Sequence, residues 1–116
     1  MAARFALALL FLVACGAAGA PDTRPDITGT ITRLTPAGSV GSILVEERPE
    51  QVSGSAKASV RVTEATTIWR TAGTTTARGS FGELAAGLVV RVWFEGPVAE
   101  SYPVQGAAKT IVILGR

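Results

Sequence analysis

After residue 25 the chain is built from short segments in which apolar β-branched side chains alternate with polar ones, and this alternation constrains its fold most. In residues 57–63, for example, Val60 and Val62 alternate with polar neighbours. Residues 88–95, Leu-Val-Val-Arg-Val-Trp-Phe-Glu, are predicted to form the strongest strand. A period of two residues is that of a half-buried strand, and abundant Gly, Thr and Val suit strands and turns more than helices. The pattern therefore predicts an all-β domain.

Clusters of Gly, Pro and Ser divide this domain into five main strands. One interval differs, because Ser80 is followed three residues later by Glu83, a capping-box spacing that predicts a single helical turn ended by Gly87. We expect a loop at 71–80 before this turn and a long connection at 96–107. The predicted strands are 26–34, 40–46, 57–63, 88–95 and 109–114, with a short extended piece at 67–70.

This order of elements is that of the OB-fold, in which a helix separates the third strand from the fourth. The sequence therefore predicts a small five-stranded Greek-key barrel, OB-fold-like, with one short helical turn before the fourth strand. Gly29, in the middle of the first strand, predicts a bend or bulge of the kind that small barrels use. A small open β-sandwich is the alternative fold.

The start of the chain has the organisation of a bacterial lipoprotein signal peptide. Arg4 precedes an unbroken apolar run at 5–13, and the only cysteine of the chain, Cys15, follows it. The run is too short to span a membrane, which takes about 20 apolar residues. We expect cleavage after residue 14 and lipid attached to the Cys15 thiol. Two alternatives stay open, namely cleavage after Ala20 by the ordinary signal peptidase, with Pro21 next, and an uncleaved anchor.

The chain thus divides into a signal peptide at 1–14, a flexible tether at 15–25 and the β-domain at 26–116. The tether has no hydrophobic periodicity, and such a coil reaches roughly 15 to 20 Å. A lipid anchor would bind the protein to a membrane in the cell envelope, outside the cytoplasm. Because Gly16 rather than an aspartate follows the cysteine, we expect the outer membrane if the cell is Gram-negative.

The chain contains no histidine, which excludes several kinds of functional site. Ser-His-Asp and Cys-His nucleophilic sites and imidazole zinc sites all need one. Cys15 is the only thiol, so we expect no disulfide, thiolate metal site or redox motif in the domain. We predict no enzyme activity, no catalytic residues, no metal and no cofactor. Removing Arg4 from the 11 basic residues leaves ten against 9 acidic ones, and this near-neutral balance predicts no nucleic-acid binding.

The connection between the last two predicted strands is the best candidate site, because in an OB-fold this loop flanks the ligand-binding face. Its carboxylates, hydroxyl, aromatic ring and amide could bind a sugar, a peptide or a cell-wall fragment. The alternative is a purely structural loop, stiffened by prolines and turned by glycines, whose tyrosine caps the barrel. The candidate residues are Glu95, Glu100, Ser101, Tyr102 and Gln105.

The two tryptophans form a second candidate site. If Val92 and Phe94 face the core, then Trp93 faces outward beside Arg91. In residues 67–70 the same alternation places Trp69 on the opposite face of its strand from Ile68. An exposed ring beside an arginine could stack on a sugar, a base or another ring. The alternative is that Trp93 packs beneath the long connection or the helical turn.

Residues 90–106, Val-Arg-Val-Trp-Phe-Glu-Gly-Pro-Val-Ala-Glu-Ser-Tyr-Pro-Val-Gln-Gly, are followed by Ala108 and Lys109. Together they resemble the signature of the YobA-like family, a Val-Trp-Phe strand, a Gly, Glu-Ser-Tyr-Pro-x-Gln and a final strand after Ala-Lys. The resemblance implies a small β-domain that is secreted or lipid-anchored in bacteria. It implies no activity, because the function of that family is unknown.

Three functions follow as hypotheses. In the first, the protein is a non-enzymatic, lipid-anchored module that binds an envelope protein or glycan through the long connection and the outward tryptophan. In the second, it is a structural or accessory envelope lipoprotein that acts through protein contacts and has no small ligand. The third is a nucleic-acid-binding OB-fold, against which the charge balance and the envelope location argue. The sequence does not define the oligomeric state.

Overall fold

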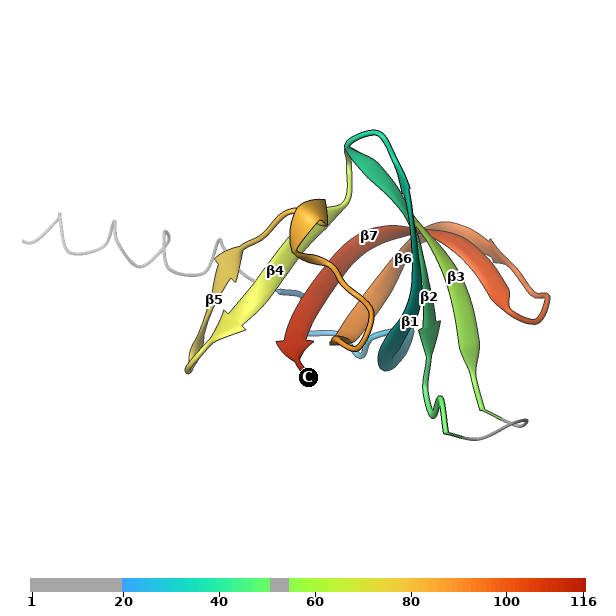
Figure 1. Cartoon of the computed structure of the whole chain (residues 1–116), viewed down its shortest axis with the longest axis horizontal. Coiled ribbons are helices and arrows are strands. Elements are labelled where there is room, and N and C mark those ends of the chain that lie inside the picture. Colours follow the sequence, from blue (N-terminus) through green and yellow to red (C-terminus); the bar gives the residue numbers. More distant parts are fainter. Residues whose placement is uncertain (1–19, 51–54) are drawn as a thin grey trace, which may run out of the picture.

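The computed structural model describes residues 20–50 and 55–116 (Figure 1), so the predicted signal peptide and Cys15 lie outside the described residues. No helix in these two ranges is long and apolar enough to cross a membrane. The elements are β1 (Ile27–Ala37), β2 (Val40–Glu46), β3 (Lys57–Val62), β4 (Thr67–Ala72), β5 (Thr75–Arg78), the 3-10 turn η2 (Phe81–Glu83), β6 (Val89–Ala99) and β7 (Val104–Gly115).

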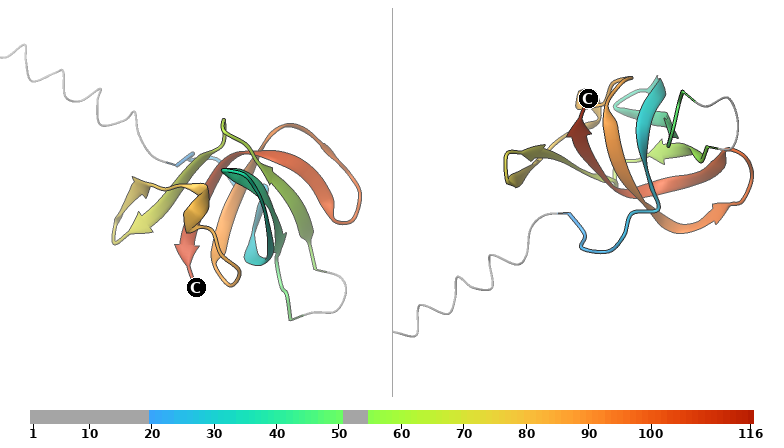
Figure 2. Two further views of the ribbon diagram at one scale, coloured as in Figure 1. Left: turned by 45° about the horizontal axis from the view of Figure 1, so that its top comes forward. Right: turned by 90° about the horizontal axis from the view of Figure 1, so that it is seen from below.

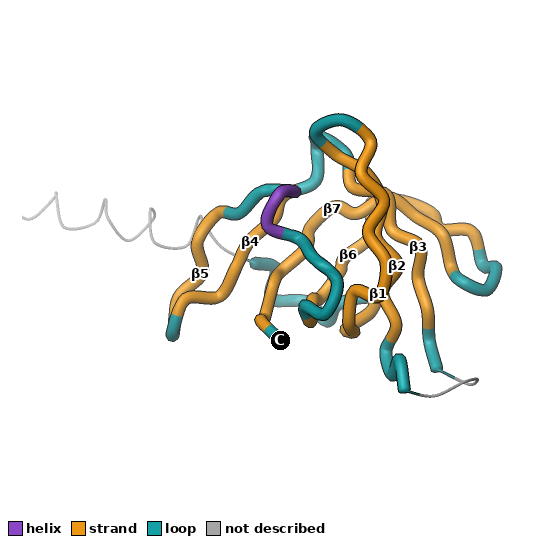
Figure 3. The backbone as a smooth tube through the Cα atoms, in the orientation of Figure 1, coloured by secondary structure: helices purple, strands orange, loops and turns teal. Residues whose placement is uncertain are grey.

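Five of these strands close into a barrel, whose arrangement is visible in Figures 1 and 3. β1, β2 and β3 form an antiparallel meander, and β3 then pairs in parallel with β7. β7 pairs antiparallel with β6, and β6 returns to β1 to complete the ring. The predicted all-β, five-stranded Greek-key barrel is thus confirmed, and the open β-sandwich is wrong.

Aliphatic side chains at alternating positions of the barrel strands fill the interior. This alternation is why the period of two in the sequence predicts the core well. Leu84, which follows η2, also enters the core. The buried core consists of Ile27, Ile31, Ile43, Val45, Ala58, Val60, Val62, Ile68, Leu84, Val90, Val92, Ala108, Ile111 and Ile113.

The loop predicted at 71–80 is wrong, because part of it is strand β5. β5 pairs antiparallel with β4, from Trp69 opposite Arg78 to Ala72 opposite Thr75. β4 is itself held in parallel by β7, so its other edge is a ready template for a threonine-rich segment with good strand propensity. Gly73, at a φ of 66°, lies in the turn between the two strands.

The long connection predicted at 96–107 is also wrong. β6 and β7 continue beyond the barrel as the two arms of a hairpin whose tip is at 100–103, and Figure 1 shows these arms projecting from the barrel beside β3. The ladder between the arms is irregular between Glu95 and Ala99, where Pro97 lies. Proline has no N–H to donate, so it is tolerated where the ladder is interrupted.

A short turn joins β5 to β6, as the capping-box spacing predicts. The Glu83 carboxylate accepts a hydrogen bond from the Ser80 N–H at 3.0 Å, and it also accepts one from Arg70 Nη1 at 2.9 Å. This carboxylate therefore ties the turn to β4. The turn is a 3-10 turn that ends at Glu83, with Leu84 as its C-cap, earlier than the predicted end at Gly87.

A bulge in β1 decides what this strand presents to solvent. The register against β2 shifts between Ile31 and Arg33, so Thr32 is the extra residue. Ile31 lies inside the barrel, and strict alternation would bring Arg33 inside as well. The extra residue shifts the alternation, so that Leu34 packs against the core and Arg33 is exposed.

Candidate functional site

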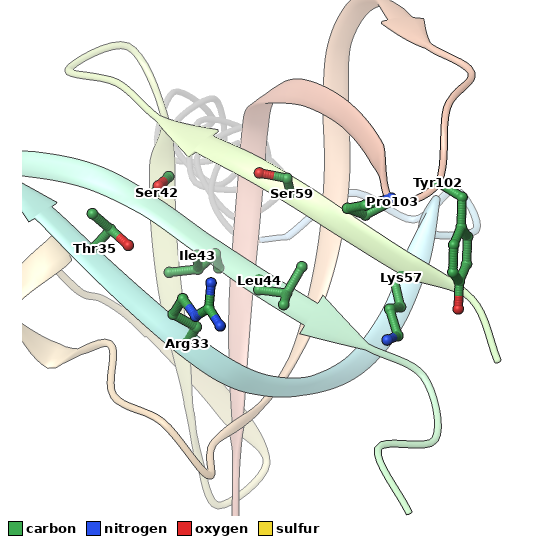
Figure 4. Close-up of a pocket in the computed structure, with 9 residues that line it drawn as sticks. All are labelled: Arg33, Thr35, Ser42, Ile43, Leu44, Lys57, Ser59, Tyr102 and Pro103. Atoms are coloured by element: carbon green, nitrogen blue, oxygen red, sulfur yellow. The ribbon is translucent and has the colours of Figure 1, made fainter. Parts of the chain in front are cut away.

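A groove of about 480 Å³ lies on the outer surface of β1, β2 and β3, and the tip of the β6–β7 hairpin closes one end of it (Figure 4). In OB-folds the surface of the second and third strands and the loop between the last two strands bind ligands. The groove therefore lies where this fold commonly places a binding site. Its lining residues are Arg33, Thr35, Ser42, Ile43, Leu44, Lys57, Ser59, Tyr102 and Pro103.

Tyr102 is exposed but fixed. It is 60% exposed, whereas every other large hydrophobic side chain in the described residues is at least partly buried. Its hydroxyl donates a hydrogen bond to the carbonyl of Ser55 at 2.8 Å, and Lys57 Nζ lies 5.6 Å from the centre of its ring. Because these contacts already hold the ring, a ligand that stacks on it does not have to order it first.

Lys57 is held in place by side chains of the neighbouring barrel strands. Its Nζ lies 3.6 Å from Oε1 of Glu46, and Oε2 of Glu46 accepts a hydrogen bond from Thr32 Oγ1 at 2.7 Å. Thr32, Glu46 and Lys57 belong to β1, β2 and β3, so the row of contacts crosses the three strands and ends at Tyr102. The bulge residue of β1 thus helps to fix the tyrosine at the mouth of the groove.

Arg33 is the second cation of the groove. It makes no ion pair with any residue in the ranges 20–50 and 55–116. The hydroxyls of Thr35, Ser42 and Ser59 line the same groove. A guanidinium can bind a carboxylate through two parallel hydrogen bonds, and hydroxyls donate and accept. These groups suit noncovalent recognition of a polar ligand that carries rings and a negative charge.

The residues predicted in the connection separate into two groups. Tyr102 lines the groove, whereas the Ser101 hydroxyl donates to the carbonyl of Pro103 at 2.8 Å and stabilises the hairpin tip. Glu95, Glu100 and Gln105 are exposed and do not line the groove. Within the described part of the chain, no cluster of three or more His, Cys, Asp and Glu side chains could hold a metal ion.

Trp93 points away from the barrel core, as the alternation predicts, but it is only 8% exposed. Of the two alternatives for Trp93, an exposed ring is therefore wrong and a covered ring is correct, but neither the long connection nor the helical turn covers it. Its indole Nε1–H lies 3.1 Å from both the carbonyl and the hydroxyl oxygen of Thr23, so the segment before β1 covers it. The carboxylate of Asp26 also accepts the N–H of Phe94 at 2.8 Å. Trp93, Tyr102 and Gln105 consequently do not line one patch.

Trp69 and Arg91 lie on the outer surface of the sheet formed by β6, β7, β4 and β5, which is not the surface that carries the groove. Arg91 is exposed, and Trp69 is half-buried beneath the guanidinium of Arg78, whose Cζ lies 5.4 Å from the ring centre. These two candidates therefore belong to a surface separate from that of Tyr102.

Sequence reasoning missed the residues that β1, β2 and β3 contribute to the groove. Arg33 would have been placed inside the barrel by strict alternation, because the bulge at Thr32 has no signature in the sequence. Lys57 and Ser59 alternate with buried residues of β3, and this pattern together with the expected OB-fold could have placed them on the ligand-binding strands.

Residues 39–115, more than half of the chain, match the family described as Protein of unknown function (DUF3221). No curated protein and no solved structure shows a significant match. The matched range begins in the turn before β2 and includes every later strand, the groove-closing hairpin among them. The chain is accordingly a member of the DUF3221 family.

Proposed function

We propose that the protein is a non-enzymatic, lipid-anchored module of the bacterial cell envelope whose groove binds an acidic glycan. The observation that carries the proposal is Tyr102, a large exposed ring held by its hydrogen bond to Ser55 at one end of a groove that two cations and three hydroxyls also line. Small-ligand sites commonly combine apolar or aromatic surface with a few placed polar groups. A glycan that bears carboxylates satisfies both the aromatic ring and the Arg33 guanidinium.

Isothermal titration with soluble fragments of digested peptidoglycan, whose sugars and peptides carry carboxylates, tests the groove directly. We expect Tyr102→Ala and Arg33→Gln each to weaken binding about tenfold, because each removes a principal contact of the ligand. A neutral glucan such as maltohexaose should bind the wild-type protein more weakly, since it cannot engage the guanidinium.

Arg91→Gln is the matched control, since it removes an exposed arginine from a surface that does not line the groove. We expect its affinity for the fragments to equal that of the wild type. Wild-type protein that binds neither probe would contradict the glycan proposal and would favour the accessory lipoprotein that acts through protein contacts. Equal losses in the groove variants and in Arg91→Gln would contradict the assignment of the site.

The anchor is tested on the full chain expressed in bacteria and labelled with a radioactive fatty acid. We expect the label in the membrane fraction of the wild type and its loss in Cys15→Ser, because lipid attachment needs the thiol. Mass spectrometry of the mature protein should show Cys15 as the first residue, carrying the acyl chains. A Cys15→Ser protein that still fractionates with membranes would overturn the anchor, as would a wild type without fatty chains.

We further infer that the chain is a YobA-like member of its family. The residues that carry this resemblance, 90–106, form most of β6, the hairpin tip and the start of β7. They include Tyr102 and Pro103, which line the groove. The resemblance thus includes the hairpin that closes the proposed binding site. This supports the inference that the hairpin has the same role in the YobA-like proteins as in this chain.

A further inference from the structure

The sheet surface opposite the groove carries a row of four residues in direct register. Arg91 on β6 is opposite Val112 on β7, Val112 is opposite Trp69 on β4, and Trp69 is opposite Arg78 on β5. Neighbours such as Ile68, Ile111 and Val92 face the core, so the row lies on the outer surface of the sheet. Within the row the two arginines are exposed and Trp69 is half-buried, whereas Val112 is covered and only 2% exposed. We call Arg91, Val112, Trp69 and Arg78 the outer row.

The outer row combines an aromatic centre with a cation at each end. Adjacent strands lie about 4.8 Å apart, so the row spans roughly 14 Å. Arg78 lies over the Trp69 ring, and both arginines are exposed. Neither makes an ion pair with any residue in the described ranges. Asp26 and Glu47 line the same hollow as Arg91, without an ion pair to it, and Arg78 has no acidic neighbour in the row. Two exposed guanidinium groups with an indole between them are complementary to an anionic interface.

The chain that leads to the proposed anchor leaves the domain on this same surface. Trp93, on β6 two residues after Arg91, faces the same way and is covered by Thr23. Figure 2 shows the segment before β1 passing along the outer side of β6 and β7. Thr23 is the eighth residue after Cys15, and eight residue steps of extended chain reach about 27 Å at most. Lipid on Cys15 would hold this surface near the membrane.

From this placement we infer that the outer row docks on an anionic phospholipid surface, with Trp69 in the headgroup region and Arg78 and Arg91 on lipid phosphates. The inference rests on the lipid anchor of the proposed function. Indole rings favour the membrane interface, and guanidinium groups bind phosphate through paired hydrogen bonds. A sheet docked in this way directs the groove of β1, β2 and β3 away from the bilayer, where a glycan can reach it.

Tryptophan quenching in vesicles tests the docking. Full-length lipidated protein is reconstituted into phosphatidylcholine vesicles with or without phosphatidylglycerol, both containing lipid brominated near the top of the acyl chains. Trp69→Phe, measured in parallel, separates the signal of Trp69 from that of buried Trp93. We expect Trp69 to be quenched in the anionic vesicles and much less in the neutral ones. Arg78→Gln and Arg91→Gln should each lower the ratio of docked to undocked protein about fivefold.

Arg61→Gln, which removes an exposed cation from β3, is the control and should leave the quenching unchanged. Equal quenching in neutral and anionic vesicles, or quenching unaffected by the two arginine variants, would overturn the inference while leaving the anchor in place. Flotation of the same vesicles in a density gradient shows whether the protein is bound to them at all. Protein that floats only with anionic vesicles, and only when both arginines are present, would support the docking and contradict the anchor. Protein that floats on neither kind of vesicle would overturn both.

Discussion

Gly29→Ala is expected to lower the stability of the domain strongly, although it adds only one methyl group. A Cβ at this position would collide with the backbone carbonyl of Glu46 and lie 3.0 Å from Cα of Glu47. β1 pairs with β6 up to Thr30 and with β2 from Thr30 onward, so Gly29 lies where the strand passes from one partner to the other. Backbone atoms cannot move aside without breaking one of these ladders.

We expect a loss of about 3 kcal/mol, or roughly 10 to 20 °C in Tm, measured by circular dichroism during heating. Gly82→Ala is the matched control, because its Cβ would find only Ser80 Oγ at 3.9 Å. Its Tm should stay close to that of the wild type. A Gly29→Ala protein as stable as this control would show that the close approach of β1 and β2 is not a constraint on the barrel.

Trp93→Ala is expected to have an effect of similar size, for a different reason. The side chain is buried between the outer surface of β6 and the segment before β1, and its Nε1–H bonds to Thr23. Truncating a buried tryptophan typically costs about 3 to 5 kcal/mol through the lost burial and the cavity left behind. Urea denaturation followed by circular dichroism measures this loss.

Two milder variants separate packing from hydrogen bonding. Trp93→Phe keeps much of the ring and loses the N–H, so we expect a cost of about 1 kcal/mol. Thr23→Val removes only the hydroxyl and leaves the carbonyl acceptor, so its cost should be smaller still. If Trp93→Phe lost peptidoglycan binding while remaining as stable as the wild type, Trp93 would be a binding residue rather than a structural one.

The prediction for the barrel succeeds because it depends on local pattern. In β3 and β6 buried aliphatic residues recur at every second position, because each strand buries one face. This period of two predicts both that the segment is a strand and which of its side chains face the core. The capping-box spacing at Ser80 likewise depends on contacts within one turn. The predictions fail where pairing depends on distant partners. β5 forms because β7 holds β4 in place, and the arms of β6 and β7 extend past Pro97 because each has the other as partner.

The candidate site shows the same division. Tyr102 could be chosen from its own segment, because a ring between turn residues on the connection of an OB-fold points to a binding loop. Arg33 could not, since a bulge one residue earlier reverses the side to which it points. Trp93 has the direction that alternation predicts, yet its burial comes from Thr23, which lies 70 residues away in sequence.

The amino-acid sequence by itself determined that this is a histidine-free, single-cysteine all-β chain with a five-strand barrel, and it placed a tyrosine on the connection before the last strand. Only the tertiary structure decided that Tyr102 closes a groove with Arg33 and Lys57, that Trp93 is covered, and that Trp69 lies in a row with two arginines. The reason is physical. Which face of a strand is apolar is fixed by residues two positions apart, whereas neighbours across a barrel are fixed by register and closure, which involve the whole chain.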